Sequence, residues 1–213
     1  MASARLSKRV ATARRAVFLD RDGVINENVE GDYVRDWAGF RLLPGSLEAI
    51  ASLTHAGYPI VVVTNQQGVG KGLMAAAEVE GIHSGMLTAI EEAGGRVDAV
   101  LYCPHLEAEG CDCRKPKPGM LRRAASDLGL DLARSVFVGD ALSDMEAALS
   151  AGCKAVLVLT GRGRTTRTQL LADDRYAAVT VVDDLAAAAR LLLTNGVTRS
   201  RGGGRWSRGR GAD

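Results

Sequence analysis

Two aspartates follow a short apolar run near the start of this chain. Asp20 and Asp22 come directly after residues 16–19, and Gly23 follows them. The apolar run predicts a buried strand, so both carboxylates are expected at its carboxyl end, the edge where open parallel α/β sheets bind ligands. Carboxylates this close repel each other unless they share a proton or hold a cation, and Mg²⁺ suits oxygen ligands and phosphate-bearing substrates. The pair therefore indicates a Mg²⁺ site for phosphoryl chemistry, with an Asp-rich turn of no function as the alternative.

Polar residues also follow three later apolar runs. They are Thr64 and Asn65 after a β-branched run, Lys115 after a cysteine-rich loop, and Asp140 with Asp144 after a fourth run. Taken singly, Thr64 is explained by a helix cap and Asp140 by a turn. Because the carboxyl ends of parallel strands meet at one edge of a sheet, we expect all of these clusters to lie together.

This set of residue types is what phosphoryl transfer through an aspartyl phosphate requires. One carboxylate attacks phosphorus, while a carboxyl group two residues away protonates the leaving alkoxide and later activates water. A hydroxyl and backbone N–H groups at Thr64 and Asn65, together with the Lys115 ammonium, neutralise charge on the phosphoryl oxygens. Asp140 would complete the metal shell with Asp20.

A second group of side chains has the composition of a zinc site. Three thiols and one imidazole lie within a short loop, at Cys103, His105, Cys111 and Cys113. Four such ligands close a tetrahedral shell, which is the arrangement of structural Zn²⁺. Reduced thiols beside a surface histidine are the alternative. Because Lys115 follows Cys113 closely, bound zinc would also fix the approach of this lysine, whereas Cys153 stands apart and is expected in the core.

The pattern of apolar residues predicts the elements that position these side chains. Continuous apolar runs predict strands at residues 16–19, 58–63, 97–102, 135–138, 155–159 and 178–182. Helical periodicity and punctuating glycines predict helices at about residues 46–57, 75–93, 117–128, 143–152 and 184–194, and residues 160–164 are expected to form a loop. Strands alternating with helices predict a single α/β domain built on a doubly wound parallel sheet.

Four short motifs in this order resemble the haloacid dehalogenase superfamily. They are DRDG at residues 20–23, TNQ at 64–66, RKP at 114–116 and GDxxxD at 139–144. The match spans about residues 16–160. The resemblance implies that Asp20 is the nucleophile and that Asp22 is the general acid and base. It also implies that Mg²⁺ is held by Asp20, by the backbone carbonyl of Asp22 and by Asp140.

Cap domains of this superfamily are inserted after the first motif or between the second and the third. In this chain the first interval holds a loop, a helix and a strand, and the second holds a helix, a strand and the cysteine loop. Neither interval has room for a cap. We therefore expect a capless domain whose site is open to solvent and whose substrate supplies its own bulk.

Within the superfamily, the zinc loop and residues 114–120 resemble the D-glycero-D-manno-heptose 1,7-bisphosphate 7-phosphatases, and residues 31–34 and 64–72 agree with this. The resemblance implies a phosphatase that uses Mg²⁺ and structural Zn²⁺ to remove the C7 phosphate through an aspartyl phosphate. It places Arg114 near the second phosphate, to which the guanidinium fork is suited. The implied substrate contacts are Asn28, Gly31, Thr64, Asn65, Gln66, Gln67, Arg114 and Lys115.

Two other functions stay open. The short spacing from His105 to Cys111 is as in histidinol-phosphate phosphatase domains, which apply the same chemistry to another leaving group. A nucleic-acid end-processing or binding protein is suggested by the arginine-rich ends of the chain. Deletion of residues 197–213 would test this last function, because a sugar phosphatase should keep full turnover without them.

Cationic residues gather at the two ends of the chain. Residues 1–15 hold five cations and no acid, and residues 197–213 hold five arginines and one aspartate, although the 213-residue chain has a net charge of only +2. The body between them is therefore net acidic. Such ends cannot bury enough apolar surface to fold, which predicts a basic disordered tail at 1–14, a phosphatase domain at 15–196 and an Arg/Gly-rich disordered tail at 197–213.

No apolar run approaches the roughly 18–20 residues that cross a bilayer, and no apolar segment suggests a secretory signal. We therefore expect a cytoplasmic monomer that binds a small sugar phosphate and no membrane. Nucleic acid is not an expected partner, except under the end-processing alternative.

Overall fold

The computed structural model describes residues 13–198. In this part of the chain, six parallel strands form one sheet in the order β3-β2-β1-β4-β5-β6. Their bounds are β1 Val17–Leu19, β2 Ile60–Asn65, β3 Ala99–Cys103, β4 Val136–Gly139, β5 Lys154–Val158 and β6 Thr180–Val182. The chain order reverses on the two sides of β1, so the strand ends at β1 and β4 open onto a crevice where ligands can bind.

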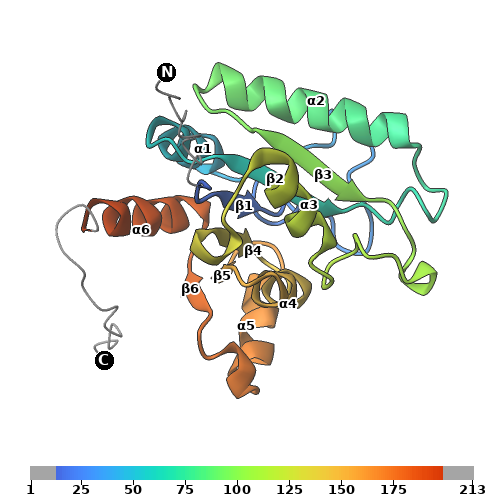
Figure 1. Ribbon diagram of the computed structural model, residues 1–213. Coiled ribbons are helices and arrows are strands. Elements are labelled where there is room, and N and C mark those ends of the chain that lie inside the picture. The colour runs from blue at the N-terminus through green and yellow to red at the C-terminus, as the bar shows by residue number, and fades with distance from the viewer. Residues whose placement is uncertain (1–12, 199–213) are drawn as a thin grey trace, which may run out of the picture.

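Helices cover both faces of this sheet (Figure 1). Helices α1 (Ser46–His55), α2 (Ala76–Glu92) and α6 (Leu185–Thr198) pack on one face, and α3 (Gly119–Leu128), α4 (Leu142–Ala151) and α5 (Gly163–Leu171) pack on the other. Alternate residues of one strand serve opposite faces: Val17 and Leu19 belong to the first core, and Phe18 belongs to the second. Burial on both faces explains why the strands are continuous apolar runs rather than alternating ones. The short 3₁₀ helices are Glu107–Glu109, Leu132–Arg134 and Asp174–Tyr176.

The predicted doubly wound parallel sheet is confirmed, and so is the absence of a cap. Between β1 and β2 the chain forms only a loop and α1, and between β2 and β3 it forms a loop and α2. The predicted strands are all present, although β2 extends to Asn65 and therefore includes two polar residues expected just after it. Cys153 is buried in the core, as predicted, but lies just before β5 rather than in the strand.

One helix was not predicted. Helix α5 follows the loop at residues 160–162, and its sequence begins with a glycine and holds three threonines, which are poor helix formers. It forms because Thr166 and Leu170, one turn apart, are buried on its inner side. Helix α6 continues to Thr198, just past the domain boundary predicted at residue 196. The two predicted basic tails lie almost entirely outside the described residues.

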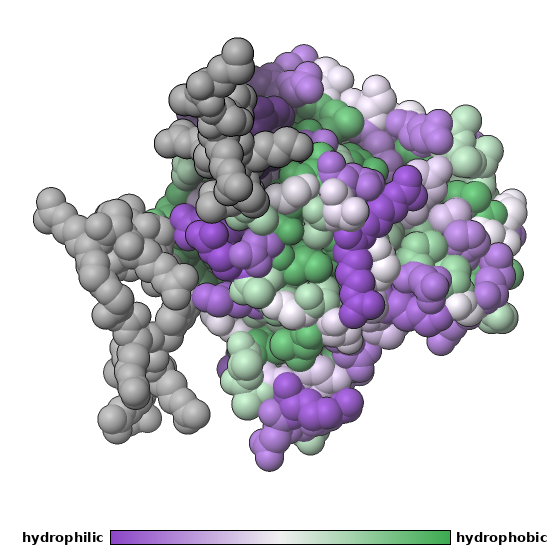
Figure 2. Space-filling view, in the orientation of Figure 1, coloured by the Kyte–Doolittle hydropathy of each residue, from purple (hydrophilic) through white to green (hydrophobic). Residues whose placement is uncertain are grey.

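The surface seen in Figure 2 mixes polar and apolar side chains over the face of α3, α4 and α6. Helices in the described part of the chain all fall short of the length and apolar character needed to cross a membrane.

Candidate active site

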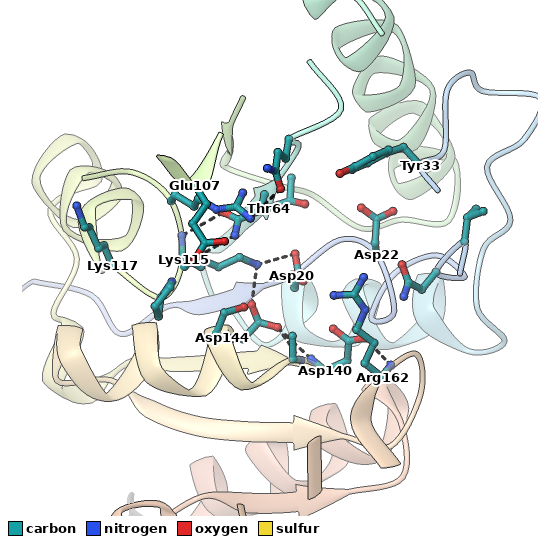
Figure 3. A pocket seen from close by; sticks show the side chains of 18 of the residues that line it. Asp20, Asp22, Tyr33, Thr64, Glu107, Lys115, Lys117, Asp140, Asp144 and Arg162 are labelled. Carbon is teal, nitrogen blue, oxygen red and sulfur yellow. Dashed lines mark hydrogen bonds and ion pairs between the residues drawn. The ribbon is translucent and has the colours of Figure 1, made fainter. Parts of the chain in front are cut away.

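A cleft of about 470 Å³ opens at the carboxyl ends of the central strands. Asp20 follows β1, Thr64 lies near the end of β2, and Asp140 follows β4. Figure 3 shows these side chains converging from separate elements on one point. The strand ends thus gather the clusters that the sequence places far apart in the chain.

The Lys115 ammonium lies at the centre of the charged groups. Its Nζ is 2.8 Å from Asp20 Oδ1 and 2.7 Å from Asp144 Oδ1, and it donates a hydrogen bond to the Val63 carbonyl at 3.0 Å. Burial by itself would lower the pKa of Lys115, but the Asp144 and Asp20 carboxylates raise the pKa above its usual value. Lys115 therefore stays cationic beside the carboxylate that is expected to attack phosphorus.

Three buried carboxylates share this single ammonium. One oxygen from each of Asp20, Asp140 and Asp144 lies within 4.8 Å of the others. Burial, together with repulsion from Asp144, raises the pKa of Asp20 to about 7 against the pull of Lys115, and it raises the pKa of Asp140 to about 8. A hard divalent cation would relieve this repulsion, and the all-oxygen donor set fits Mg²⁺.

Two glycines leave room for the Asp140 carboxylate. A Cβ at Gly23 would lie 2.1 Å from Asp140 Oδ2, and one at Gly161 would lie 2.2 Å from the same atom. Both residues also have positive φ, at +85° and +53°. The Arg162 N–H donates to Asp140 Oδ2 at 2.7 Å, so the loop after β5 holds this carboxylate from the other side.

The Asp22 carboxylate is fixed by a network of its own. Arg21 Nη2 donates to both Asp22 oxygens at 2.8 Å, Asn26 Nδ2 donates to Oδ1 at 2.9 Å, and Gln66 Nε2 donates to Oδ2 at 2.9 Å. Burial would raise the pKa of Asp22, but the Arg21 charge and these hydrogen bonds bring it below its usual value. The Asp22 carboxylate is therefore stabilised by Arg21, Asn26 and Gln66, whereas the Asp20 carboxylate is paired with Lys115.

Two polar side chains at the end of β2 have different partners: the Thr64 hydroxyl is available to the substrate, and the Asn65 amide binds the protein backbone. Thr64 Oγ1 accepts a hydrogen bond from Gln66 Nε2 at 2.9 Å, which leaves the Thr64 hydroxyl proton for another acceptor. Asn65 instead bonds the backbone of Lys115, through Nδ2 at 3.0 Å and Oδ1 at 3.1 Å. Asn65 lines the cleft but uses its amide to hold Lys115.

Basic side chains surround the mouth of the cleft. Arg114, Lys117 and Arg162 all line it, together with the acids Asp32 and Glu107. Arg114 Nη2 donates to Gln67 Oε1 at 3.0 Å, whereas its buried Nη1 has no protein partner. The Nη1 group is a donor that a bound anion would satisfy.

The predicted zinc ligands lie together. Cys113 Sγ is 3.3 Å from Cys103 Sγ and 3.4 Å from Cys111 Sγ, and His105 Nδ1 is 3.2 Å from Cys113 Sγ. Ligands around one tetrahedral Zn²⁺ with Zn–S bonds of about 2.3 Å are roughly 3.8 Å apart, close to these separations. The four residues therefore have the composition and spacing of a closed zinc shell next to the cleft.

Most of the predicted site residues meet at the cleft. Asp20, Asp22, Thr64 and Lys115 line it, as do Asn28, Asn65, Gln67, Arg114 and Asp140. Two predicted substrate residues do not line it: Gly31 is in an exposed loop, and Gln66 is buried beneath Asp22.

The sequence alone named Asp144 without giving it a role, and it did not indicate four other residues of the site. These are Arg21, Asn26, His83 and Arg162. An arginine between two catalytic aspartates is visible in the sequence, whereas a lone histidine in an apolar helix gives no signal.

Comparison with known proteins places the chain in a family. A model of the haloacid dehalogenase-like hydrolases matches residues 2–149, and a second HAD-hydrolase-like model matches residues 112–188. The D-glycero-beta-D-manno-heptose-1,7-bisphosphate 7-phosphatase of Pseudomonas aeruginosa is 43% identical over 85% of this chain and 99% of that protein. The D-glycero-alpha-D-manno-heptose-1,7-bisphosphate 7-phosphatase of Mycobacterium bovis is 45% identical over 67% of this chain and 78% of that protein.

A solved structure agrees with these relatives. The D,D-heptose 1,7-bisphosphate phosphatase of B. bronchiseptica, complexed with magnesium and phosphate, has a TM-score of 0.80 and 44% sequence identity, covering 85% of this chain and 99% of that one. By its motifs, its fold and these comparisons, the protein belongs to the haloacid dehalogenase-like hydrolases.

Proposed function

We propose that the protein is a Mg²⁺-dependent phosphatase that removes the C7 phosphate of D-glycero-D-manno-heptose 1,7-bisphosphate. The observation that carries this proposal is the contact of Lys115 Nζ with the Asp20 carboxylate, inside an open cleft whose mouth is basic. The similarity to heptose bisphosphate phosphatases along most of the chain supports the same substrate.

The first chemical step is attack by the Asp20 carboxylate on phosphorus. A bond forms between an Asp20 oxygen and phosphorus, the bond from phosphorus to the sugar oxygen breaks, and the Asp22 carboxyl gives its proton to that leaving oxygen. Charge from the bound phosphate raises the pKa of Asp22, so Asp22 takes up this proton when substrate binds. Lys115 and the Thr64 hydroxyl neutralise the phosphoryl oxygens during the transfer.

The second step restores the enzyme. Asp22, now a carboxylate, takes a proton from water, the resulting hydroxide bonds to phosphorus, and the acyl–phosphate bond to Asp20 breaks. Inorganic phosphate leaves, Asp20 is again a carboxylate, and Asp22 releases to solvent the proton that it took from water. Arg21, Asn26 and Gln66 hold Asp22 in place through both steps.

The metal would be held by the Asp20 and Asp140 carboxylates and the backbone carbonyl of Asp22. When bound, Mg²⁺ supplies positive charge that offsets the charge on the phosphoryl group. Asp144 has a different task, since its Oδ2 accepts the N–H groups of Asp140 and Ala141 at 3.2 and 3.0 Å while its Oδ1 pairs with Lys115. Asp144 thus fixes the loop that carries the Asp140 ligand.

The structural metal is proposed to be Zn²⁺, bound by Cys103, His105, Cys111 and Cys113. Support comes from the sulfur and nitrogen separations and from the position of the loop. Cys113 is followed at once by Arg114 and Lys115, so this shell would anchor both a substrate residue and a catalytic residue.

The second phosphate of the substrate is proposed to bind Arg114 and Lys117. Arg114 Nη1 is buried without a protein partner among the described residues, and Lys117 also lines the cleft. Histidinol phosphate carries a cationic ammonium instead of a second phosphate, so three basic side chains at the mouth disfavour it. This electrostatic difference is what selects the sugar bisphosphate over the amino alcohol ester.

The active unit is proposed to be a monomer. Thiolate ligands for zinc support a reducing compartment such as the cytoplasm. Light scattering of the purified protein tests the proposed monomer. We expect a monomer with full activity, and activity confined to a dimer would contradict the proposal.

The substrate assignment is tested by measuring phosphate release with Mg²⁺ from four compounds side by side. They are the alpha and beta anomers of heptose 1,7-bisphosphate, histidinol phosphate and a 3′-phosphorylated oligonucleotide. We expect kcat/KM for at least one heptose bisphosphate to exceed those for the last two by about tenfold or more, and to be abolished in Asp20→Asn. A preference for histidinol phosphate or the oligonucleotide would refute the substrate assignment.

A further inference from the structure

Arg21 lies between the two catalytic aspartates, yet its side chain turns away from the cleft. It is fully buried, and none of its atoms lines the cleft. Nη2 donates to both oxygens of Asp22, and Nη1 lies 3.3 Å from Nε2 of His83. The guanidinium also lies over the Phe40 ring, with Cζ 5.9 Å from the ring centroid. Arg21 is therefore a buried bridge from Asp22 to His83.

His83 comes from a different element, helix α2. It belongs to the buried face of this helix, together with Val79, Ile82 and Met86, and it packs edge-on against Tyr102 with the ring centroids 5.6 Å apart. His83 is therefore a polar residue on a helix face whose other buried residues are apolar. Its Nε2 is used in the contact with Arg21.

The chemistry of the pair fixes the state of the imidazole. A guanidinium has only donors, so Nε2 of His83 must be an acceptor, and the ring must be neutral with its proton on Nδ1. Burial and the Arg21 charge lower the pKa of His83 to about 4, which agrees with a neutral ring at neutral pH. His83 therefore satisfies a buried donor of Arg21 without adding charge.

We propose that His83 is a positioning residue for the general acid and base of this phosphatase. It fixes the Arg21 guanidinium, and Arg21 in turn fixes the Asp22 carboxylate beside the leaving oxygen. Without an acceptor at position 83, Arg21 Nη1 would be a buried unpaired donor, and the guanidinium would shift toward other acceptors. The proposal rests on the role of Asp22 given above and extends the site to helix α2.

Two substrates with different leaving groups distinguish a positioning role of His83 from a merely structural role. An alkyl phosphate needs a proton on its leaving oxygen, whereas p-nitrophenolate departs from p-nitrophenyl phosphate without one. For both substrates, kcat/KM reports the steps up to departure of the leaving group. Misplacement of Asp22 therefore lowers kcat/KM for the alkyl phosphate and spares the aryl phosphate, while general damage to the site lowers both together.

The experiment compares His83→Leu and His83→Gln with the wild type, with Mg²⁺ present. The alkyl substrate is whichever compound of the panel above the wild type hydrolyses best, so the result does not depend on the heptose assignment. For His83→Leu we expect the ratio of alkyl to aryl kcat/KM to fall by about tenfold or more. His83→Gln keeps an amide oxygen for Arg21 and should retain a ratio within about threefold of the wild type.

Two controls complete the design. His55→Leu removes the histidine of α1, whose Nδ1 contacts only the Ala51 carbonyl at 2.7 Å within its own helix, and it should leave the ratio unchanged. In an Arg21→Lys background, which lacks the fork to Asp22, adding His83→Leu should change the ratio by no more than about twofold.

Equal losses with the two substrates, or a His83→Gln variant as impaired as His83→Leu, would overturn the proposal. The proposal would also be overturned if His83→Leu lowered the ratio of alkyl to aryl kcat/KM in the Arg21→Lys background as much as it does in the wild type. Failure of the substrate proposal would look different, because it would appear in the wild-type panel before any position 83 variant is made.

Discussion

The side chain of Asn65 holds the backbone of Lys115 by two hydrogen bonds, one to its carbonyl at 3.0 Å and one from its N–H at 3.1 Å. Fifty residues separate the two in the chain. Asn65 is the last residue of β2 and pairs in register with Cys103, the first zinc ligand, on β3. The contact therefore joins the central sheet to the segment that carries the catalytic lysine.

Asn65→Ala should lower kcat by about tenfold to a hundredfold, because Lys115 Nζ would lose its fixed distance from the reacting carboxylate. KM should change less, since both the nitrogen and the oxygen of the Asn65 amide bind the backbone of Lys115. Steady-state kinetics check this, with zinc content and the unfolding midpoint measured to confirm an intact fold. A normal kcat with a raised KM would instead make Asn65 a substrate ligand.

Gly161→Ala should weaken Mg²⁺ binding. The added Cβ would lie 2.2 Å from Asp140 Oδ2 and 2.6 Å from the Gly23 Cα, so the carboxylate must move. We expect the Mg²⁺ concentration for half-maximal activity to rise by about tenfold or more.

Gly152→Ala is the matched control for Gly161→Ala. Gly152 also has positive φ, at +80°, but a Cβ there would meet nothing within 4 Å. It should cost stability through backbone strain and leave the Mg²⁺ requirement unchanged. An equal shift of the Mg²⁺ requirement in both variants would show that strain, not contact with Asp140, is the cause.

Cys113→Ser should reduce bound zinc and lower kcat by about tenfold or more, because the loop leading into Arg114 and Lys115 would lose its anchor. Elemental analysis of the purified protein, run beside activity, measures both. Cys153→Ser is the control, since Cys153 is buried in the core and is not part of the Cys103, His105, Cys111 and Cys113 group. It should lose stability and keep its zinc. Full activity in a zinc-free Cys113→Ser protein would contradict the anchoring role.

His83 should make stability depend on pH below neutrality. Its pKa is about 4 in the folded protein against 6.5 for the free side chain, so the unfolded chain binds more protons between these values. The free energy of unfolding should therefore fall as the pH is lowered from 6.5 to 4, by at most roughly 3 kcal/mol from this group.

Urea unfolding of the wild type and of His83→Gln across this range isolates that contribution. The stability difference between the two proteins should shrink or reverse in sign as the pH falls, because only the wild type loses stability by this route. A constant difference from pH 7 to pH 4 would mean that His83 is not held neutral.

The sequence was enough to predict the sheet, because the central strands β1, β2 and β4 are buried on both faces and are therefore continuous apolar runs. It also predicted the cleft, since Asp20, Thr64 and Asp140 each follow or end such a run and Lys115 follows the cysteine-rich loop after another. The zinc ligands were recognisable because their order and side-chain types are local. These signals all depend on spacing along the chain.

The parts that sequence reasoning missed depend on contacts in space. Helix α5 has weak helical propensity and is held by the burial of Thr166 and Leu170, so its pattern resembles a loop. Arg162 reaches the cleft from the loop before that helix. His83 lies on α2 and meets Arg21 only through the folding of this helix onto the sheet, and no spacing rule relates two residues that far apart.

The central claim is that Asp20 carries the phosphoryl group, and trapping that intermediate tests it most directly. Enzyme mixed rapidly with substrate and Mg²⁺, denatured in acid and treated with borohydride should contain homoserine at position 20, since borohydride reduces an acyl phosphate but not a free carboxylate. Peptide mass spectrometry locates the change. Homoserine at position 20, absent without substrate, is the expected result, and intact Asp20 together with a modified residue elsewhere would contradict the mechanism.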